Sequence, residues 1–109
     1  MENSNMDINN IAITGISGRF ANCASVEEFK QSLFNGTDLI TDNHQRWSHQ
    51  ALKTPKSMGI VNDFEKFDAS FFEINPKTSE LLDPRARKLL EVVFESIVDS
   101  GINPNDLRG

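Results

Sequence analysis

The residues of this chain that could perform chemistry are a single cysteine, two histidines and scattered acidic side chains. Cys23 lies just ahead of a predicted helix start, where the helix dipole can stabilise a thiolate and make it nucleophilic. A lone thiol without a base is usually inert, and no spacing of cysteines or carboxylates makes a metal site with His44 or His49. We therefore interpret Cys23 as unreactive and both histidines as surface residues.

A glycine-containing turn, residues 15–20, follows a short apolar run and could let backbone amides approach an anion. It lacks the third glycine of a dinucleotide fold and the Gly-Lys-Ser/Thr of a P-loop. It also lacks the pattern around a nucleophilic serine, because Arg19 stands two residues after Ser17, where a glycine is needed. Neighbouring acids such as Glu27 and Glu28 are typical of a helix start. The residues thus predict no catalytic, cofactor or metal site.

Composition is typical of a soluble globular protein, with 38% hydrophobic and 25% charged residues. The net charge of -5 argues against nucleic acid as a partner, since nucleic-acid-binding proteins cluster Lys and Arg against phosphates. The polar start carries no secretory signal, and no apolar run is long enough to insert into a membrane. One cysteine cannot form an internal disulfide, which fits a reducing compartment. We expect a cytoplasmic protein.

The elements that position these residues begin after a flexible polar N-terminal tail, residues 1–10. Ile11, Ala12, Ile13 and Thr14 form a continuous apolar run closed by Gly15, which predicts a strand buried on both faces, as in a parallel sheet. A buried strand must satisfy its backbone groups on neighbouring strands. The rest of the chain offers few strand candidates, so the sheet partners are expected to lie elsewhere.

Helix signals dominate the remaining chain. Four capping residues predict helices, three of them followed by a proline and one by a glutamate three residues later. The predicted helices begin at Ser25, Asn75, Asp83 and Asn103. The first is expected to end at Asn35 and Gly36, and the third, which is the longest, at Gly101. Residues 38–59 are predicted as a surface connection. The phenylalanines at positions 64, 67, 71 and 72 predict a packed aromatic cluster, with Asp68 capping a single turn.

The longest predicted helix carries its charges against its own dipole. Arg85, Arg87 and Lys88 lie at its positive N-terminal end, and Glu95 and Asp99 lie near its negative C-terminal end. Each misplaced charge costs a few tenths of a kcal/mol. Two interpretations stay open: tertiary or subunit partners orient these groups, or the apolar face of the helix compensates for the cost.

Several separated segments follow one another in a recognisable order. They are residues 11–20 (I-A-I-T-G-I-S-G-R-F), 28–42 (E-F-K-Q-S-L-F-N-G-T-D-L-I-T-D), Arg46 with Trp47, 67–74 (F-D-A-S-F-F-E-I), and 82–109, with D-P-R-A-R-K-L-L-E and D-S-G-I-N-P-N-D-L-R-G. In this order they resemble the N-terminal stretch of the β-ketoacyl synthase domain of type I fatty acid and polyketide synthases. Residues 55–63 and Trp47 are more similar to animal fatty acid synthases, those of insects included. The sequence departs from the family at Ala21, Glu73 and Arg85, where proline, glycine and glutamine are common.

The resemblance implies a partial thiolase-like layered α/β fold. Residues 11–109 would be an incomplete N-terminal part of the domain, mainly helical, with residues 11–14 as one strand of the central sheet. The family condenses acyl and malonyl thioesters with decarboxylation in fatty acid biosynthesis, using a cysteine and two histidines. Those residues lie downstream of position 109 in the family, so Cys23, His44 and His49 match none of them. The isolated chain is expected to be inactive.

For the parent protein the resemblance implies an acyltransferase with several partners and cofactors. We expect a homodimer, with the rest of the synthase chain and a carrier domain bearing phosphopantetheine as partners, and NADPH in reductase domains. Two alternatives stay open: a fragment of a polyketide synthase ketosynthase, and a truncated interaction protein without catalytic activity.

Overall fold

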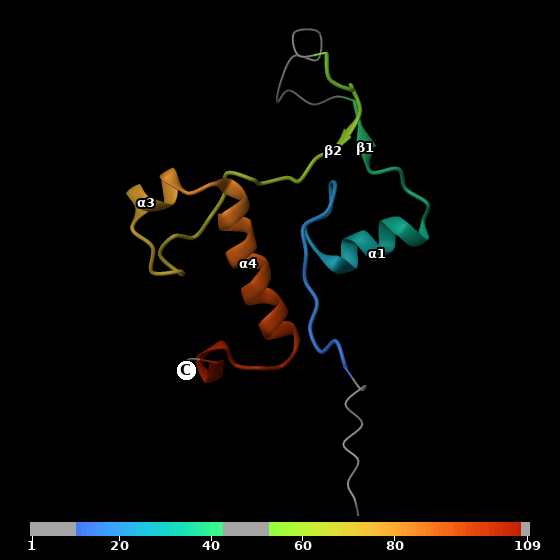
Figure 1. Cartoon of the computed structure of the whole chain (residues 1–109). Coiled ribbons are helices and arrows are strands. Elements are labelled where there is room, and N and C mark those ends of the chain that lie inside the picture. The colour runs from blue at the N-terminus through green and yellow to red at the C-terminus, as the bar shows by residue number, and fades with distance from the viewer. Residues whose placement is uncertain (1–10, 43–52, 108–109) are drawn as a thin grey trace, which may run out of the picture.

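The computed structural model describes residues 11–42 and 53–107. Along the chain these residues form α1 (Val26–Phe34), β1 (Ile40–Thr41), β2 (Met58–Gly59), α3 (Pro76–Leu81), α4 (Pro84–Asp99) and a 3-10 turn, η1 (Pro104–Leu107) (Figure 1). The predicted tail, residues 1–10, and His44, Arg46, Trp47 and His49 lie outside the described residues.

Each helix begins at the capping residue that the sequence predicted. Ser25 Oγ accepts a hydrogen bond from the Glu28 amide at 3.2 Å, and Asp83 Oδ1 accepts one from the Arg85 amide at 2.8 Å. Such acceptors satisfy amides that have no partner within the helix. Asn75 caps α3 and Asn103 caps η1 in the same way. The predicted glycine stops are also confirmed, because Gly36 and Gly101 adopt φ values of 65° and 79°.

The sheet consists of a short antiparallel pair. Ile40 lies opposite Gly59 and Thr41 opposite Met58. The sequence predicted only a surface connection over residues 38–59, and strands of two residues are too short to show an alternating pattern. The amide of Asn22 donates to the carbonyl of Ile60 at 2.8 Å, which ties this pair to the turn before α1.

The predicted strand at residues 11–14 is not formed within the described chain. Ile11 and Ile13 are 91% and 88% exposed, and the segment has no ladder partner among the described residues. A strand exists only where a neighbouring strand accepts and donates its backbone hydrogen bonds. Instead of pairing with a strand, the chain runs on alongside α4. The blue trace of residues 11–20 in Figure 1 lies between α1 and α4.

Aromatic packing holds α4 to the loop before α3. Phe71 and Phe94 meet edge to face with ring centroids 4.8 Å apart, and Phe67 and Phe72 stack at 5.2 Å. The predicted aromatic cluster is thus confirmed for Phe67, Phe71 and Phe72, with Phe94 of α4 as an additional member. Phe64 lines a separate hollow beside Lys88. Burial is otherwise sparse: among the described residues, Cys23 and Ser79 are the buried ones, 5% and 8% exposed.

Candidate functional site

Three residues of the N-terminal segment bind one side of α4, and we call these contacts the Arg19 clamp. The Ile16 amide donates to Asp99 Oδ2 at 2.8 Å, and the Ser17 hydroxyl donates to the Val92 carbonyl at 2.5 Å. Arg19 donates through both terminal nitrogens to the Glu95 carboxylate, at 2.7 and 2.5 Å. Such a bidentate pair fixes orientation as well as distance. The clamp sets the position of the segment along the helix.

Gly15 allows the segment to approach α4 this closely. A Cβ at position 15 would overlap the carbonyl oxygen of Ser96 and would lie 2.9 Å from the Cβ of Ser100. Because the first of these atoms belongs to the helix backbone, it cannot move aside as a flexible side chain could. The glycine is therefore explained by packing against α4, without an anion at the turn.

The reversed charges of α4 have partners in three cases. Glu95 is bound by Arg19, whose hydrogen bond lowers the pKa of the carboxyl group, and the same bond raises the pKa of Arg19. Asp99 accepts the Ile16 amide. Lys88 donates to the Glu91 carboxylate at 2.8 Å and to the Lys66 carbonyl at 2.7 Å. The first of the two interpretations, orientation by tertiary contacts, holds for these three residues.

The two arginines at the start of α4 differ from each other. Arg85 binds its own capping residue, Asp83, at 2.7 Å, and this hydrogen bond lowers the pKa of Asp83 to about 2. Arg87 forms no ion pair within the described chain, and its Nε is shielded from solvent without a hydrogen-bond partner. Tertiary contacts thus leave two members of the reversed set unexplained: Arg85 has a local partner, and Arg87 has no ion pair within the described residues.

Cys23 is buried beside α1. Its Sγ lies 3.6 Å from the hydroxyl of Ser32, and it lines a hollow of about 260 Å³ with Arg19, Lys66 and Lys88. Each of these cations already binds a carboxylate: Arg19 binds Glu95, Lys66 binds Asp63 at 2.7 Å and Lys88 binds Glu91. His44 and His49, the other candidates of the sequence, lie outside the described residues. The interpretation of Cys23 as unreactive stays a prediction.

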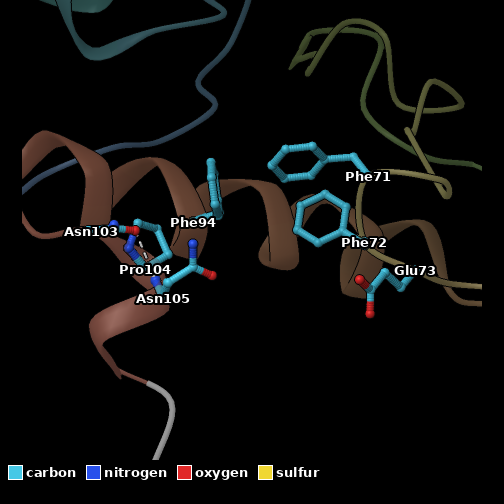
Figure 2. A pocket seen from close by; sticks show the side chains of 7 residues that line it. All are labelled: Phe71, Phe72, Glu73, Phe94, Asn103, Pro104 and Asn105. Atoms are coloured by element: carbon cyan, nitrogen blue, oxygen red, sulfur yellow. Dashed lines mark hydrogen bonds between the residues drawn. The ribbon is translucent and has the colours of Figure 1, made fainter.

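A second hollow, of about 450 Å³, lies between the aromatic cluster and the C-terminal turn. Figure 2 shows Phe71, Phe72 and Phe94 along one part of it, Glu73 at one end and Asn103, Pro104 and Asn105 at the other. Its lining contains one carboxylate and two amides but no thiol or imidazole. This arrangement can donate and accept hydrogen bonds, and it offers no pair of nucleophile and base.

The face of α4 that points away from the Arg19 clamp forms an apolar groove of about 500 Å³. We call it the α4 groove; its lining residues are Phe72, Leu82, Ala86, Leu89, Leu90, Val93, Phe94 and Ile97. Leu89 and Val93 are 62% and 48% exposed. A helix stripe of this kind is normally buried against another element. The groove is therefore a candidate surface for contact with further protein.

Residues 11–42 and 53–107 contain no group of three His, Cys, Asp or Glu side chains placed to hold a metal ion. None of the helices within these ranges is both long and apolar enough to cross a membrane.

Comparison with known proteins identifies the family. Residues 9–109 match the family model described as "Beta-ketoacyl synthase, N-terminal domain". The chain is 43% identical over 99 residues to a fatty acid synthase of the goose Anser anser anser, and the match covers 91% of this chain and 28% of that protein. It is 35% identical over 107 residues to polyketide synthase PksM of Bacillus subtilis, with 89% of this chain and 2% of that protein covered.

A solved structure is similar along most of the chain. The ketosynthase from module 6 of the bacillaene synthase of Bacillus subtilis 168 superposes with a TM-score of 0.82 at 37% identity, over 88% of this chain and 18% of that one. The thiolase-like fold implied by the sequence is confirmed by this similarity. The chain spans less than a third of each of these relatives. It belongs to the family of β-ketoacyl synthase N-terminal domains.

Proposed function

We propose that the chain is the N-terminal scaffold of the ketosynthase of an animal-type fatty acid synthase. The observation that carries this proposal is the 43% identity to the goose fatty acid synthase over 91% of the chain, against 35–37% for the bacterial and mycobacterial polyketide synthases. The parent protein would condense acyl and malonyl thioesters as an acyltransferase. Its carrier phosphopantetheine, its NADPH, its homodimer partner and its cytoplasmic location belong to the same proposal.

The geometry supports a scaffold role, with catalysis elsewhere in the parent. The polar contacts of the Arg19 clamp join backbone and side chains of two elements, and none of them pairs a nucleophile with a base. Cys23 contacts a serine hydroxyl. Covalent condensation needs a thiol with a base and donors for the developing oxyanion. We infer that these groups come from other parts of the parent chain and that residues 1–109 alone are inactive.

A hybrid enzyme tests the proposal. Residues 9–109 replace the matching stretch of the goose fatty acid synthase, and the hybrid is assayed for fatty acids made from acetyl and malonyl thioesters with NADPH. Retained fatty acid synthesis is the expected result. Within the hybrid, Cys23→Ala should keep the condensation rate, because Cys23 takes no part in the reaction. Loss of condensation in Cys23→Ala with an unchanged melting temperature would contradict the scaffold role.

A polyketide synthase is the second candidate. It is favoured by the structural similarity to a bacillaene ketosynthase at 37% identity. A hybrid that restores product formation only in a polyketide synthase host, and not in the goose enzyme, would select this candidate.

A further inference from the structure

The end of α1 is formed by Asn35 and Gly36, a dipeptide with chemistry of its own. Asn35 is the only asparagine of the sequence that is followed directly by a glycine. In such a pair the backbone nitrogen of the glycine can attack the side-chain amide carbon, because glycine has no Cβ to hinder the approach. Both residues are exposed, and a Cβ built on Gly36 would meet no atom within 4 Å. The described residues therefore leave room for this reaction.

The helix end itself calls for a glycine at position 36. Gly36 has a φ of 65°, which only glycine adopts without cost. Its amide donates to the Leu33 carbonyl at 3.2 Å, and the Thr37 amide donates to the Ser32 carbonyl at 2.9 Å. These two hydrogen bonds form a Schellman motif, which satisfies carbonyls at the end of a helix. The residue that ends α1 is thus also the residue that makes Asn35 reactive.

In the closed turn the two reacting atoms are held apart. The ψ of Asn35 is -5°, and a ψ near zero places the Gly36 nitrogen beside the Asn35 nitrogen. Ring closure needs the Gly36 nitrogen beside the Asn35 Cβ instead. The hydrogen bond from the Gly36 amide to Leu33 must also break before that nitrogen can attack. The reaction therefore requires the last turn of α1 to open, and helix ends open more easily than helix interiors.

We propose that Asn35 is a site of spontaneous deamidation and that opening of the last turn of α1 sets its rate. The Gly36 nitrogen loses its proton and forms a bond to Asn35 Cγ. The bond from Cγ to Nδ2 then breaks, and the nitrogen leaves as ammonia after taking up a proton. Water opens the resulting cyclic imide at either carbonyl, which leaves aspartate or isoaspartate at position 35. The only co-reactant is water.

The product weakens the turn that protected the asparagine. A new carboxylate at position 35 lies at the negative end of the α1 dipole, and the last turn of α1 contains no basic residue to offset it. Isoaspartate also lengthens the backbone by one methylene group. The chain then runs to Leu39, whose carbonyl accepts the Asn22 side chain at 3.2 Å, and on to β1. Deamidation should therefore speed hydrogen exchange of the Gly36 and Thr37 amides and loosen the link to Asn22.

The test uses the goose hybrid that contains residues 9–109, kept in mildly alkaline buffer either folded or in guanidinium chloride. Peptide mass spectrometry follows the conversion of each asparagine. Asn75 and Asn103 are internal controls, because the prolines that follow them have no N–H to attack with. Thr37→Pro removes one hydrogen bond of the Schellman motif and leaves the Asn35–Gly36 pair intact.

We expect Asn35 to be the first of these asparagines to react, about tenfold more slowly in the folded hybrid than in guanidinium chloride. Thr37→Pro should remove most of this difference without changing the rate in guanidinium chloride. The proposal is overturned if Asn35 keeps its amide in guanidinium chloride while other asparagines react. It is also overturned if Asn35 reacts as fast in a hybrid that melts cooperatively as in guanidinium chloride. Should the goose hybrid not melt cooperatively, the bacillaene ketosynthase serves as host for the same comparison. These readouts follow one amide, so they stand whether or not the goose hybrid makes fatty acids.

Discussion

Removal of the Arg19 guanidinium should release the N-terminal segment from α4. The side chains of Arg19 and Glu95 are 20% and 42% exposed, so their ion pair lies between exposed pairs, worth about 0–1 kcal/mol, and buried charged hydrogen bonds, worth about 1.5–3 kcal/mol. We expect Arg19→Met to lower the local opening free energy of the segment by about 1 kcal/mol. The Ile16 amide, which donates to Asp99, reports this opening by hydrogen exchange. Its exchange should become about fivefold faster.

A double-mutant cycle isolates the pair from other effects of the substitution. Glu95→Gln should speed Ile16 exchange to a similar extent, and the double variant should add little to either single change. The control cycle uses Arg85→Met and Asp83→Asn, an exposed pair in the first turn of α4 that should leave Ile16 exchange unchanged. The reasoning is refuted if Arg19→Met and Glu95→Gln act additively, or if Ile16 exchange in Arg19→Met equals that of the unmodified chain.

Three further predictions concern pH and two backbone positions. The folded-state pKa of Glu95 lies below its ordinary value of 4.5. The stabilisation by Arg19 is therefore full above pH 4.5 and is lost as the pH falls through the lowered pKa. An NMR titration of the Arg19 side chain should show this loss, and in Glu95→Gln the Arg19 signals should no longer change over that pH range. Ala21 precedes Asn22, whose φ is 54°, in a tight turn, where proline at the second position is favourable. Ala21→Pro should therefore slow exchange of the Cys23 amide, by about 0.4–1 kcal/mol in opening free energy. Glu73 has a φ of 54°, a backbone conformation that costs about 1–2 kcal/mol for a residue other than glycine. Glu73→Gly should remove this cost and slow exchange of the Ile74 amide. Faster exchange would show that the backbone at position 73 is not strained.

The helices could be predicted from the sequence because their signals are local. Ser25 with Glu28, and Asp83 with Pro84, specify a helix start within a few residues, and the structure places α1 and α4 at these positions. The glycine at position 101 ends α4 for an equally local reason, its positive φ. Caps and stops of this kind join residues that are only a few positions apart. A short stretch of sequence is therefore enough to predict them, whatever packs around the helix.

Contacts between distant segments could be predicted only in part. The reversed charges of α4 indicated that Glu95 needs a partner, but Arg19 lies 76 residues away and no local pattern connects the two. Gly15 looked like part of an anion site because a glycine needed for close packing has the same sequence signature as one needed for a ligand. Residues 11–14 have the apolar pattern of a strand. A strand also needs hydrogen bonds to a neighbouring strand, and the pattern does not show whether that neighbour is present.

The site predictions differ in what tested them. The absence of catalytic residues follows from the resemblance and from motif spacing, and it awaits the hybrid assay. Two of the three departures from the family, Ala21 and Glu73, have a structural meaning, because both lie in or beside a positive-φ turn where the backbone favours the family's residue. Each of these two departures therefore predicts a difference in local stability that amide exchange can measure.

The separation of 83 residues between Ile16 and Asp99 also matters during protein synthesis. At a translation rate of about 5–20 residues per second, the ribosome needs roughly 4–17 s to make the helix that receives Ile16 after Ile16 itself has been made. During that interval the Ile16 amide has no acceptor on α4, and we expect the apolar stretch of Ile11, Ile13 and Ile16 to be open to chaperones that bind extended apolar segments. Synonymous codons that slow translation between these two positions would lengthen that exposure without changing a single amino acid.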